Sequence, residues 1–174
     1  MDAVFLFKDP TDDPKEGMMT TVPPSVLMVC LGNICRSPMA EGMLRHLAMQ
    51  RSMTVRTDSA GTSNFHVGEA PDTRAVQCMA GHGIDIRDLR ARQFVAGDLD
   101  RFDRVFVMDR SNLQHVRHLL GGREDGGKVS LIMDLLPGHP LREVPDPYYG
   151  GDQGFEQVYA MLDQACSILL DELR

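Results

Sequence analysis

The chain has 174 residues, 43% of them hydrophobic, and a formal net charge of -7 at pH 7. This length suits one domain with a substantial core, and the acidic balance excludes a general nucleic-acid-binding protein, which needs a basic face to neutralise phosphates. No apolar run approaches the ~20 residues of a membrane-spanning helix, so we expect no membrane partner.

Residues 1–24 are predicted to be a flexible extension, because they combine prolines with clustered charge and show no helical or strand period. A single domain is therefore expected over residues 25–174. Nothing near the start resembles a secretory signal, so we expect a cytoplasmic protein whose four cysteines are free thiols. The cysteines lack the paired C-x2-C spacing of a zinc site, and we expect no metal and no cofactor.

The predicted elements alternate along the chain. Strands are predicted at residues 26–29, 53–59, 104–108 and 129–133, and helices at 71–81, 111–120 and from about Gly154. The first helix is expected to begin near Ser37 and Pro38, with the hydroxyl as its cap and the proline at its first position. Its predicted buried face is Ala40, Met43, Leu44, Leu47 and Ala48.

Short apolar strands that alternate with amphipathic helices predict an α/β fold, in which helices cover both faces of a parallel sheet. Ligands of such sheets bind at the carboxyl ends of the strands. The loop that follows the first predicted strand lies at such an end, and we expect it to form the site.

That loop, C-L-G-N-I-C-R-S, predicts a nucleophile inside an oxyanion-binding site. Amide groups at a helix N-terminus favour a bound phosphate and the thiolate form of Cys30. Arg36 supplies a planar fork that matches two phosphoryl oxygens. Gly32 permits close backbone approach, Asn33 tolerates unusual backbone angles, and Ser37 can donate a hydrogen bond to the sulfur. The pattern predicts displacement at phosphorus through a phosphocysteine.

Hydrolysis of an aryl phosphate also needs a general acid. The leaving group is a phenolate, whose acid has a pKa of ~10, so it should be protonated as it departs. The candidate is Asp146 in the motif D-P-Y-Y-G. Pro147 fixes the backbone beside its carboxyl group, and Tyr148 and Tyr149 can form a wall against an aromatic ring. Only the fold could bring Asp146 close to Cys30.

The motifs C-L-G-N-I-C-R-S-P-M-A-E and D-P-Y-Y-G together resemble those of the low-molecular-weight protein tyrosine phosphatases, over about residues 25–174. The resemblance implies a three-layer, flavodoxin-like fold with a four-stranded parallel sheet of order 2-1-3-4. It implies metal-independent hydrolysis of protein phosphotyrosine and of small aryl phosphates. Inorganic phosphate and its analogues would be competitive ligands, and we expect a monomer or weak dimer.

The resemblance also implies roles for individual residues. Cys30 would be the nucleophile, Arg36 the phosphate clamp, and Asp146 first the acid and then the base. Asn33 would stabilise the loop with support from Ser59 and His82. The other members of the phosphate-binding loop would be Leu31, Gly32, Ile34, Cys35 and Ser37.

Five further positions are interpreted, the first three from the resemblance and the last two from the helical pattern. The resemblance implies a reversible disulfide between Cys35 and Cys30, although an ordinary buried thiol is a serious rival. Asp109 is expected to be a supporting residue. Relatives often carry Trp in the substrate cleft, where this chain has Phe65 beside Tyr148 and Tyr149. Cys78 and Cys166 lie on apolar helix faces and are predicted to be packing residues.

Three rival functions stay open. Arginine phosphatases share the scaffold but resemble C-T-G-N-T-C-R-S and lack the second tyrosine of the distal motif, so Ile34 and Tyr149 favour phosphotyrosine. An arsenate reductase of this fold needs two further cysteines after the third strand, and residues 109–145 contain none. A catalytically inactive phosphopeptide-binding module has no support, because the nucleophile, the clamp and the acid are all present.

Overall fold

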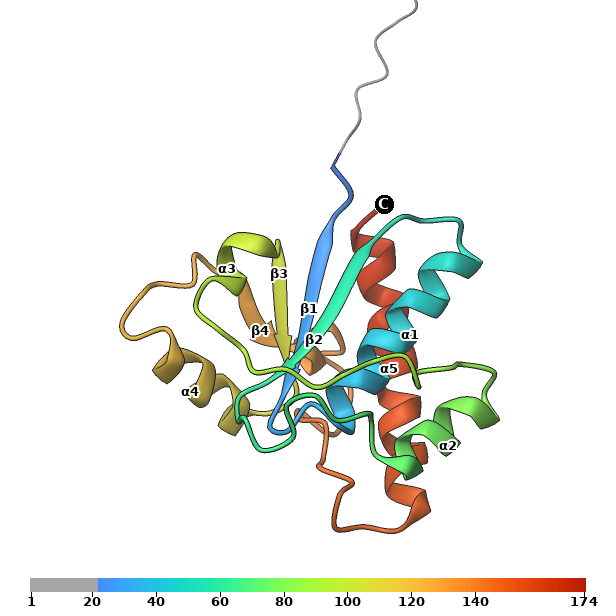
Figure 1. The fold of residues 1–174 in the computed structure, drawn as a ribbon. Helices are drawn as coiled ribbons and strands as arrows, with labels where there is room; N and C mark the ends of the chain where they lie inside the picture. Colours follow the sequence, from blue (N-terminus) through green and yellow to red (C-terminus); the bar gives the residue numbers. More distant parts are fainter. Residues whose placement is uncertain (1–21) are drawn as a thin grey trace, which may run out of the picture.

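The computed structural model describes residues 22–174, which form an α/β fold in three layers (Figure 1). Residues 1–21, most of the predicted extension, lie outside the described residues. The elements in chain order are β1 (Ser25–Cys30), α1 (Arg36–Gln50), β2 (Arg56–Gly61), α2 (Thr73–Gly81), α3 (Asp98–Arg101), β3 (Arg104–Val107), α4 (Arg110–Leu119), β4 (Val129–Leu131), the 3-10 helix η1 (Ile132–Leu135) and α5 (Asp152–Glu172).

The four strands form a parallel sheet of order β2-β1-β3-β4, which confirms the predicted fold class and strand order. Cys30 at the end of β1 is in register with Gly61 at the end of β2, and Val29 is in register with Val107 at the end of β3. The carboxyl ends of the three strands therefore meet at one edge of the sheet. The loop after β1 begins at this edge, where the strand order reverses.

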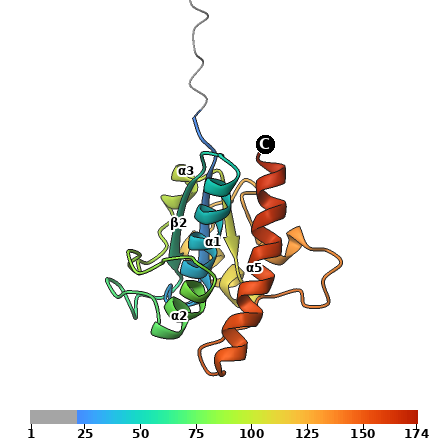
Figure 2. The ribbon, with the colours of Figure 1, turned by 90° about the vertical axis from the view of Figure 1, so that its right-hand side faces the viewer.

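Helices α1, α2 and α5 cover one face of the sheet, and α3 and α4 lie on the other (Figures 1 and 2). Side chains alternate along β1, so Val26 and Met28 pack under α1 and α5 while Leu27 and Val29 pack on the opposite side. All four are fully buried, which explains why β1 reads as a continuous apolar run. Within residues 22–174 no helix is long and apolar enough to cross a membrane.

Some predicted boundaries were wrong. Strand β2 begins at Arg56 and not at residue 53, because the chain first turns after α1 with Ser52 at a positive φ of 53°. Strand β4 ends at Leu131, where η1 begins, and the four-residue α3 was not predicted.

The start of α1 also differs from the prediction. The helix begins at Arg36, and no side chain caps its first amides. Ser37 therefore lies inside the helix and is not its cap, and Pro38 is the third helical residue, where a missing N–H costs no helical bond. The Ser37 hydroxyl is consequently available to the loop beneath it.

Candidate active site

Cys30 ends β1 with its side chain buried beneath the loop. Asn33 adopts a left-handed φ of 57°, and its backbone N–H donates a hydrogen bond of 3.3 Å to the Cys30 sulfur. Ser37 Oγ lies 3.0 Å from the same sulfur. The loop therefore holds the Cys30 sulfur between a backbone N–H and a hydroxyl group.

The Asn33 side chain fixes the direction of these hydrogen bonds. Its Oδ1 accepts the backbone N–H of Arg92 at 3.0 Å, and its Nδ2 donates to Ser37 Oγ at 2.8 Å and to Ser59 Oγ at 2.9 Å. Because Ser37 Oγ accepts from Asn33, its own proton is free for another acceptor. The Cys30 sulfur at 3.0 Å is closer than the alternative, the Ala60 carbonyl oxygen at 3.4 Å.

Glu41 continues this network into the core and was not identified as a site residue from the sequence. Ser59 Oγ donates to Glu41 Oε2 at 2.6 Å, and the glutamate is only 7% exposed. Burial raises the pKa of Glu41 to about 7, although the Ser59 hydrogen bond acts in the opposite direction. A sequence signal existed, because Glu41 lies three and seven residues before Leu44 and Ala48 on the buried face of α1.

The predicted support of the loop by His82 was wrong. His82 Nε2 lies 2.8 Å from Glu156 Oε2, and its ring stacks on Tyr159 with the ring centroids 3.6 Å apart. Helix α2 begins beside the phosphate-binding loop, and its nine residues, at about 1.5 Å each, carry His82 roughly 14 Å away. The Arg92 backbone holds Asn33 Oδ1 instead, and Ser59 lies where it was expected.

The Arg36 guanidinium is held in place by two hydrogen-bond acceptors. Its Nη1 donates to Asp109 Oδ2 at 2.6 Å and to the Val144 carbonyl oxygen at 3.1 Å, and the side chain is 3% exposed. Burial opposes its charge, but the Cys30 sulfur and the Asp109 carboxylate outweigh burial and raise the pKa of the guanidinium. Asp109 is thus placed as a supporting residue, and it also caps α4 by accepting the N–H of Asn112.

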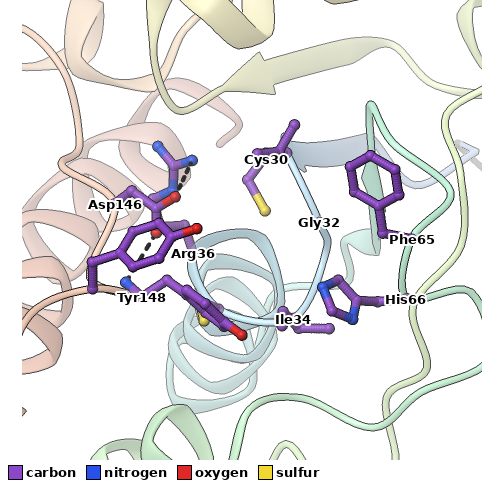
Figure 3. A pocket seen from close by; sticks show the side chains of 11 residues that line it. Cys30, Gly32, Ile34, Arg36, Phe65, His66, Asp146 and Tyr148 are labelled. Atoms are coloured by element: carbon purple, nitrogen blue, oxygen red, sulfur yellow. Dashed lines mark hydrogen bonds and ion pairs between the residues drawn. The ribbon is translucent and has the colours of Figure 1, made fainter.

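Asp146 lies beside the guanidinium (Figure 3). Its Oδ1 accepts the backbone N–H of Tyr148 at 3.0 Å, whereas its Oδ2 lies 3.7 Å from Arg36 Nη2. The backbone contact orients the carboxyl group, and its 39% exposure leaves the other oxygen accessible. The fold therefore brings the predicted acid to the predicted clamp and nucleophile.

Arg74 on α2 holds the Asp146 loop and was missed by sequence reasoning. Its Nη1 donates to the Tyr148 carbonyl oxygen at 2.9 Å, and its guanidinium lies 5.4 Å from the centre of the Tyr148 ring. Asp72 accepts two hydrogen bonds from the Arg74 guanidinium and donates its own N–H to the Ile34 carbonyl oxygen at 2.8 Å. The start of α2 thus joins the phosphate-binding loop to the Asp146 loop.

These side chains line one pocket (Figure 3). Its floor contains the predicted nucleophile and the predicted clamp, and its wall is largely apolar and aromatic. The residues that line it are Cys30, Leu31, Gly32, Ile34, Cys35, Arg36, Phe65, His66, Asp146, Tyr148 and Tyr149.

Two lining residues refine the sequence interpretation. His66, which follows Phe65 in the chain, was not predicted as a site residue; a Cβ on Gly32 would lie 3.1 Å from its ring, so the glycine permits this close approach. Cys35 is buried, and burial, with the nearby Asp72 carboxylate, raises the pKa of its thiol. A disulfide between Cys35 and Cys30 stays a prediction.

Comparison with known proteins gives one consistent result. Residues 25–174 match the family described as low molecular weight phosphotyrosine protein phosphatase. The chain is 37% identical to the low molecular weight protein-tyrosine-phosphatase YfkJ of Bacillus subtilis over 86% of this chain and 96% of that protein. It is 38% identical to the low molecular weight phosphotyrosine protein phosphatase of Sus scrofa over 90% of this chain and all of that protein.

Solved structures agree with this result. The crystal structure of YfkJ superimposes with a TM-score of 0.82 at 36% identity, covering 88% of this chain and 96% of that one. The crystal structure of DARP, a Drosophila arginine phosphatase, superimposes with a TM-score of 0.79 at 33% identity, covering 84% of this chain and 96% of that one. Similarity of fold alone therefore does not separate the two substrate classes.

Proposed function

The chain belongs to the low molecular weight phosphotyrosine protein phosphatase family, and from this premise we propose that it hydrolyses protein phosphotyrosine and small aryl phosphates through a phosphocysteine. One observation carries the proposal. The Cys30 sulfur lies at the floor of a pocket that also contains Arg36 and Asp146 and has an aromatic wall. No metal or cofactor takes part in the proposed mechanism.

In the first step the Cys30 thiolate attacks phosphorus opposite the phenolic oxygen. The Arg36 guanidinium and the amides of the loop hold the other phosphoryl oxygens, where negative charge gathers. As the S–P bond forms and the P–O bond breaks, Asp146 gives its proton to the departing phenolic oxygen. The products of this step are the tyrosine hydroxyl and a phosphocysteine.

In the second step a water molecule attacks the phosphocysteine. The Asp146 carboxylate, now without its proton, takes a proton from the water. The S–P bond breaks, inorganic phosphate forms, and the electron pair returns to the Cys30 sulfur. The Ser37 hydroxyl, 3.0 Å from that sulfur, stabilises the departing thiolate by a hydrogen bond.

The pocket wall favours an aryl phosphate over phosphoarginine. Ile34 and Phe65 are apolar, and Tyr148 and Tyr149 meet edge to face with ring centroids 5.0 Å apart. A flat phenyl ring can lie against such surfaces. A charged guanidinium gains little from apolar and aromatic walls, and the lining of this pocket offers it one carboxyl group, that of Asp146. Phosphoarginine peptide hydrolysed as fast as phosphotyrosine peptide would contradict this specificity.

The test is phosphate release from a phosphotyrosine peptide in excess EDTA. The unaltered chain should be active, Cys30→Ser should be inactive while still binding inorganic phosphate, and Cys78→Ser, a thiol change outside the pocket, should stay active. Turnover by Cys30→Ser would refute the nucleophile assignment. Inactivity of every variant on phosphotyrosine would move the test to phosphoarginine and then to arsenate with thioredoxin.

Several broader properties are part of the same proposal. The family match over residues 25–174 supports a single catalytic domain preceded by an extension. The four cysteines are free thiols, which favours a reducing compartment, and we propose the cytoplasm. Inorganic phosphate and its analogues should compete with substrate, and a monomer or weak dimer is expected.

A further inference from the structure

A second group of reactive side chains lies on α2 and α5, outside the lining of the catalytic pocket. Cys78 Sγ, His82 Nε2 and a carboxylate oxygen of Glu156 all lie within 4.8 Å of one another. Cys78 and His82 are one helical turn apart, at the end of α2, and Glu156 comes from the second turn of α5. Helices α2 and α5 lie side by side in both ribbon views (Figures 1 and 2).

The group contains three of the four side-chain types that bind zinc. The Cys78 sulfur lies 3.4 Å from Glu156 Oε1, and His82 Nε2 lies 2.8 Å from Glu156 Oε2. Tetrahedral zinc would need separations of about 3.6 Å for S···O and about 3.4 Å for N···O, from the bond lengths typical of zinc sites. These two contacts use different oxygens of Glu156, but one carboxylate oxygen lies within 4.8 Å of both the sulfur and the nitrogen. Glu156 is 56% exposed, so rotation of its side chain can bring that oxygen to the required separations.

The group of Cys78, His82 and Glu156 is buried on one side and open to solvent on the other. Cys78 is 9% exposed, and the Tyr159 ring stacks on His82 and fixes the plane of the imidazole. On the open side a surface hollow is lined by Arg74, Gln77, Cys78, Asp152, Phe155 and Glu156. Arg74 is the cation of this hollow, and Asp72 neutralises it at 3.0 Å. A cation can enter from solvent and keep water as its fourth ligand.

We propose that Cys78, His82 and Glu156 form a binding site for a divalent cation of borderline softness, with Zn²⁺ as the first candidate. Burial raises the pKa of the Cys78 thiol to about 12, so the cation must displace the thiol proton into solvent as the metal–sulfur bond forms. The site is separate from the metal-independent chemistry at Cys30. It arises from the packing of α2 against α5, and its C-x3-H spacing is not the paired-cysteine spacing for which zinc was considered from the sequence.

The experiment is a titration of the full chain with Co²⁺, a spectroscopic substitute for Zn²⁺, followed by displacement with Zn²⁺. All proteins carry Cys30→Ser, so that the catalytic thiol cannot contribute to the signal. We expect one Co²⁺ per chain with tetrahedral d–d bands and a thiolate-to-cobalt charge-transfer band. Cys78→Ser should abolish the charge-transfer band, and Glu156→Gln, at an exposed position that should not affect folding, should weaken binding at least tenfold.

The matched control is Glu69→Gln. Glu69 Oε2 lies 2.8 Å from His66 Nδ1, the same separation as between Glu156 Oε2 and His82 Nε2, but among the described residues no thiol completes a group of three ligands there. This variant should bind Co²⁺ as its parent does. Absence of Co²⁺ binding, or a charge-transfer band that survives Cys78→Ser, would overturn the proposal, and the His82–Glu156 contact would then be a structural tie between the two helices.

Discussion

Removal of the Ser37 hydroxyl should slow the breakdown of the phosphocysteine. Ser37 is fully buried, and its Oγ lies 3.0 Å from the Cys30 sulfur while accepting a hydrogen bond from Asn33. When the sulfur leaves phosphorus as a thiolate, Ser37 donates to it, and in Ser37→Ala no water replaces that donor. The remaining donor in this part of the loop is the backbone N–H of Asn33 at 3.3 Å.

The size of the effect follows from the kind of hydrogen bond. A hydrogen bond to a charged group contributes about 1.5–3 kcal/mol, and each ~1.36 kcal/mol is tenfold in rate. We therefore expect kcat to fall about 10- to 150-fold in Ser37→Ala. In stopped flow with p-nitrophenyl phosphate, the burst of nitrophenolate should persist while the steady rate after the burst falls.

The control for this experiment is Ser63→Ala. The Ser63 hydroxyl also donates to the loop, at 3.0 Å to the Leu31 carbonyl oxygen, but it makes no contact with the sulfur. Its kcat should stay within twofold of the unaltered enzyme. Equal vanadate affinity in Ser37→Ala would show that the loop keeps its shape. A Ser37→Ala enzyme with kcat within twofold would refute the role assigned to this hydroxyl.

Three further predictions concern the acid, the buried glutamate and the loop contact. Asp146→Ala should lower kcat by ~10²–10⁴, with the larger loss on phenyl phosphate than on p-nitrophenyl phosphate; equal losses on both would remove Asp146 from the mechanism. Because burial raises the pKa of Glu41 from 4.5 to about 7, the folded state binds more protons than the unfolded state, and stability falls as pH rises between these values. Glu41→Gln should remove this cost, on the order of 3 kcal/mol, so urea unfolding should show a gain over the unaltered protein at pH 8 and little at pH 4.5. A Cβ on Gly61 would lie 2.7 Å from the Leu31 carbonyl oxygen, so Gly61→Ala should destabilise the fold by ~1–3 kcal/mol and lower kcat; an unchanged melting temperature would contradict this.

Most of the fold could be predicted because its signals are local. The apolar runs of β1 and β3 reflect strands buried on both faces, and the periodicity of α5 reflects a single buried face. Helix α1 is instead buried on all sides from Arg36 to Leu44, so the single buried face predicted for it covered only part of its contacts. Boundaries were less accurate. Strand β2 begins at Arg56 and not at residue 53, and a 3-10 helix follows Leu131. These boundaries depend on where pairing with the neighbouring strand begins and ends, and a short stretch of sequence does not contain that information.

The phosphate-binding loop could be predicted for a related reason. Its nucleophile, glycine, asparagine and arginine occupy one continuous stretch between a strand and a helix, so chain connectivity alone places Cys30 and Arg36 around one centre. Support from Arg92 and Arg74 could not be found in this way. Each reaches the site from another element, and its partner depends on where that element begins and which way it points.

His82 shows most clearly the difference between what the sequence predicts and what the tertiary structure decides. The sequence by itself predicted a thiol nucleophile, an arginine clamp and a distal acid, because these residues occur in ordered motifs with their own local chemistry. Only the tertiary structure decided that α2 runs away from the loop and carries His82 to Glu156 and Tyr159. Side-chain hydrogen bonds act over about 3 Å, so their partners are fixed by the packing of helices that are distant in the sequence.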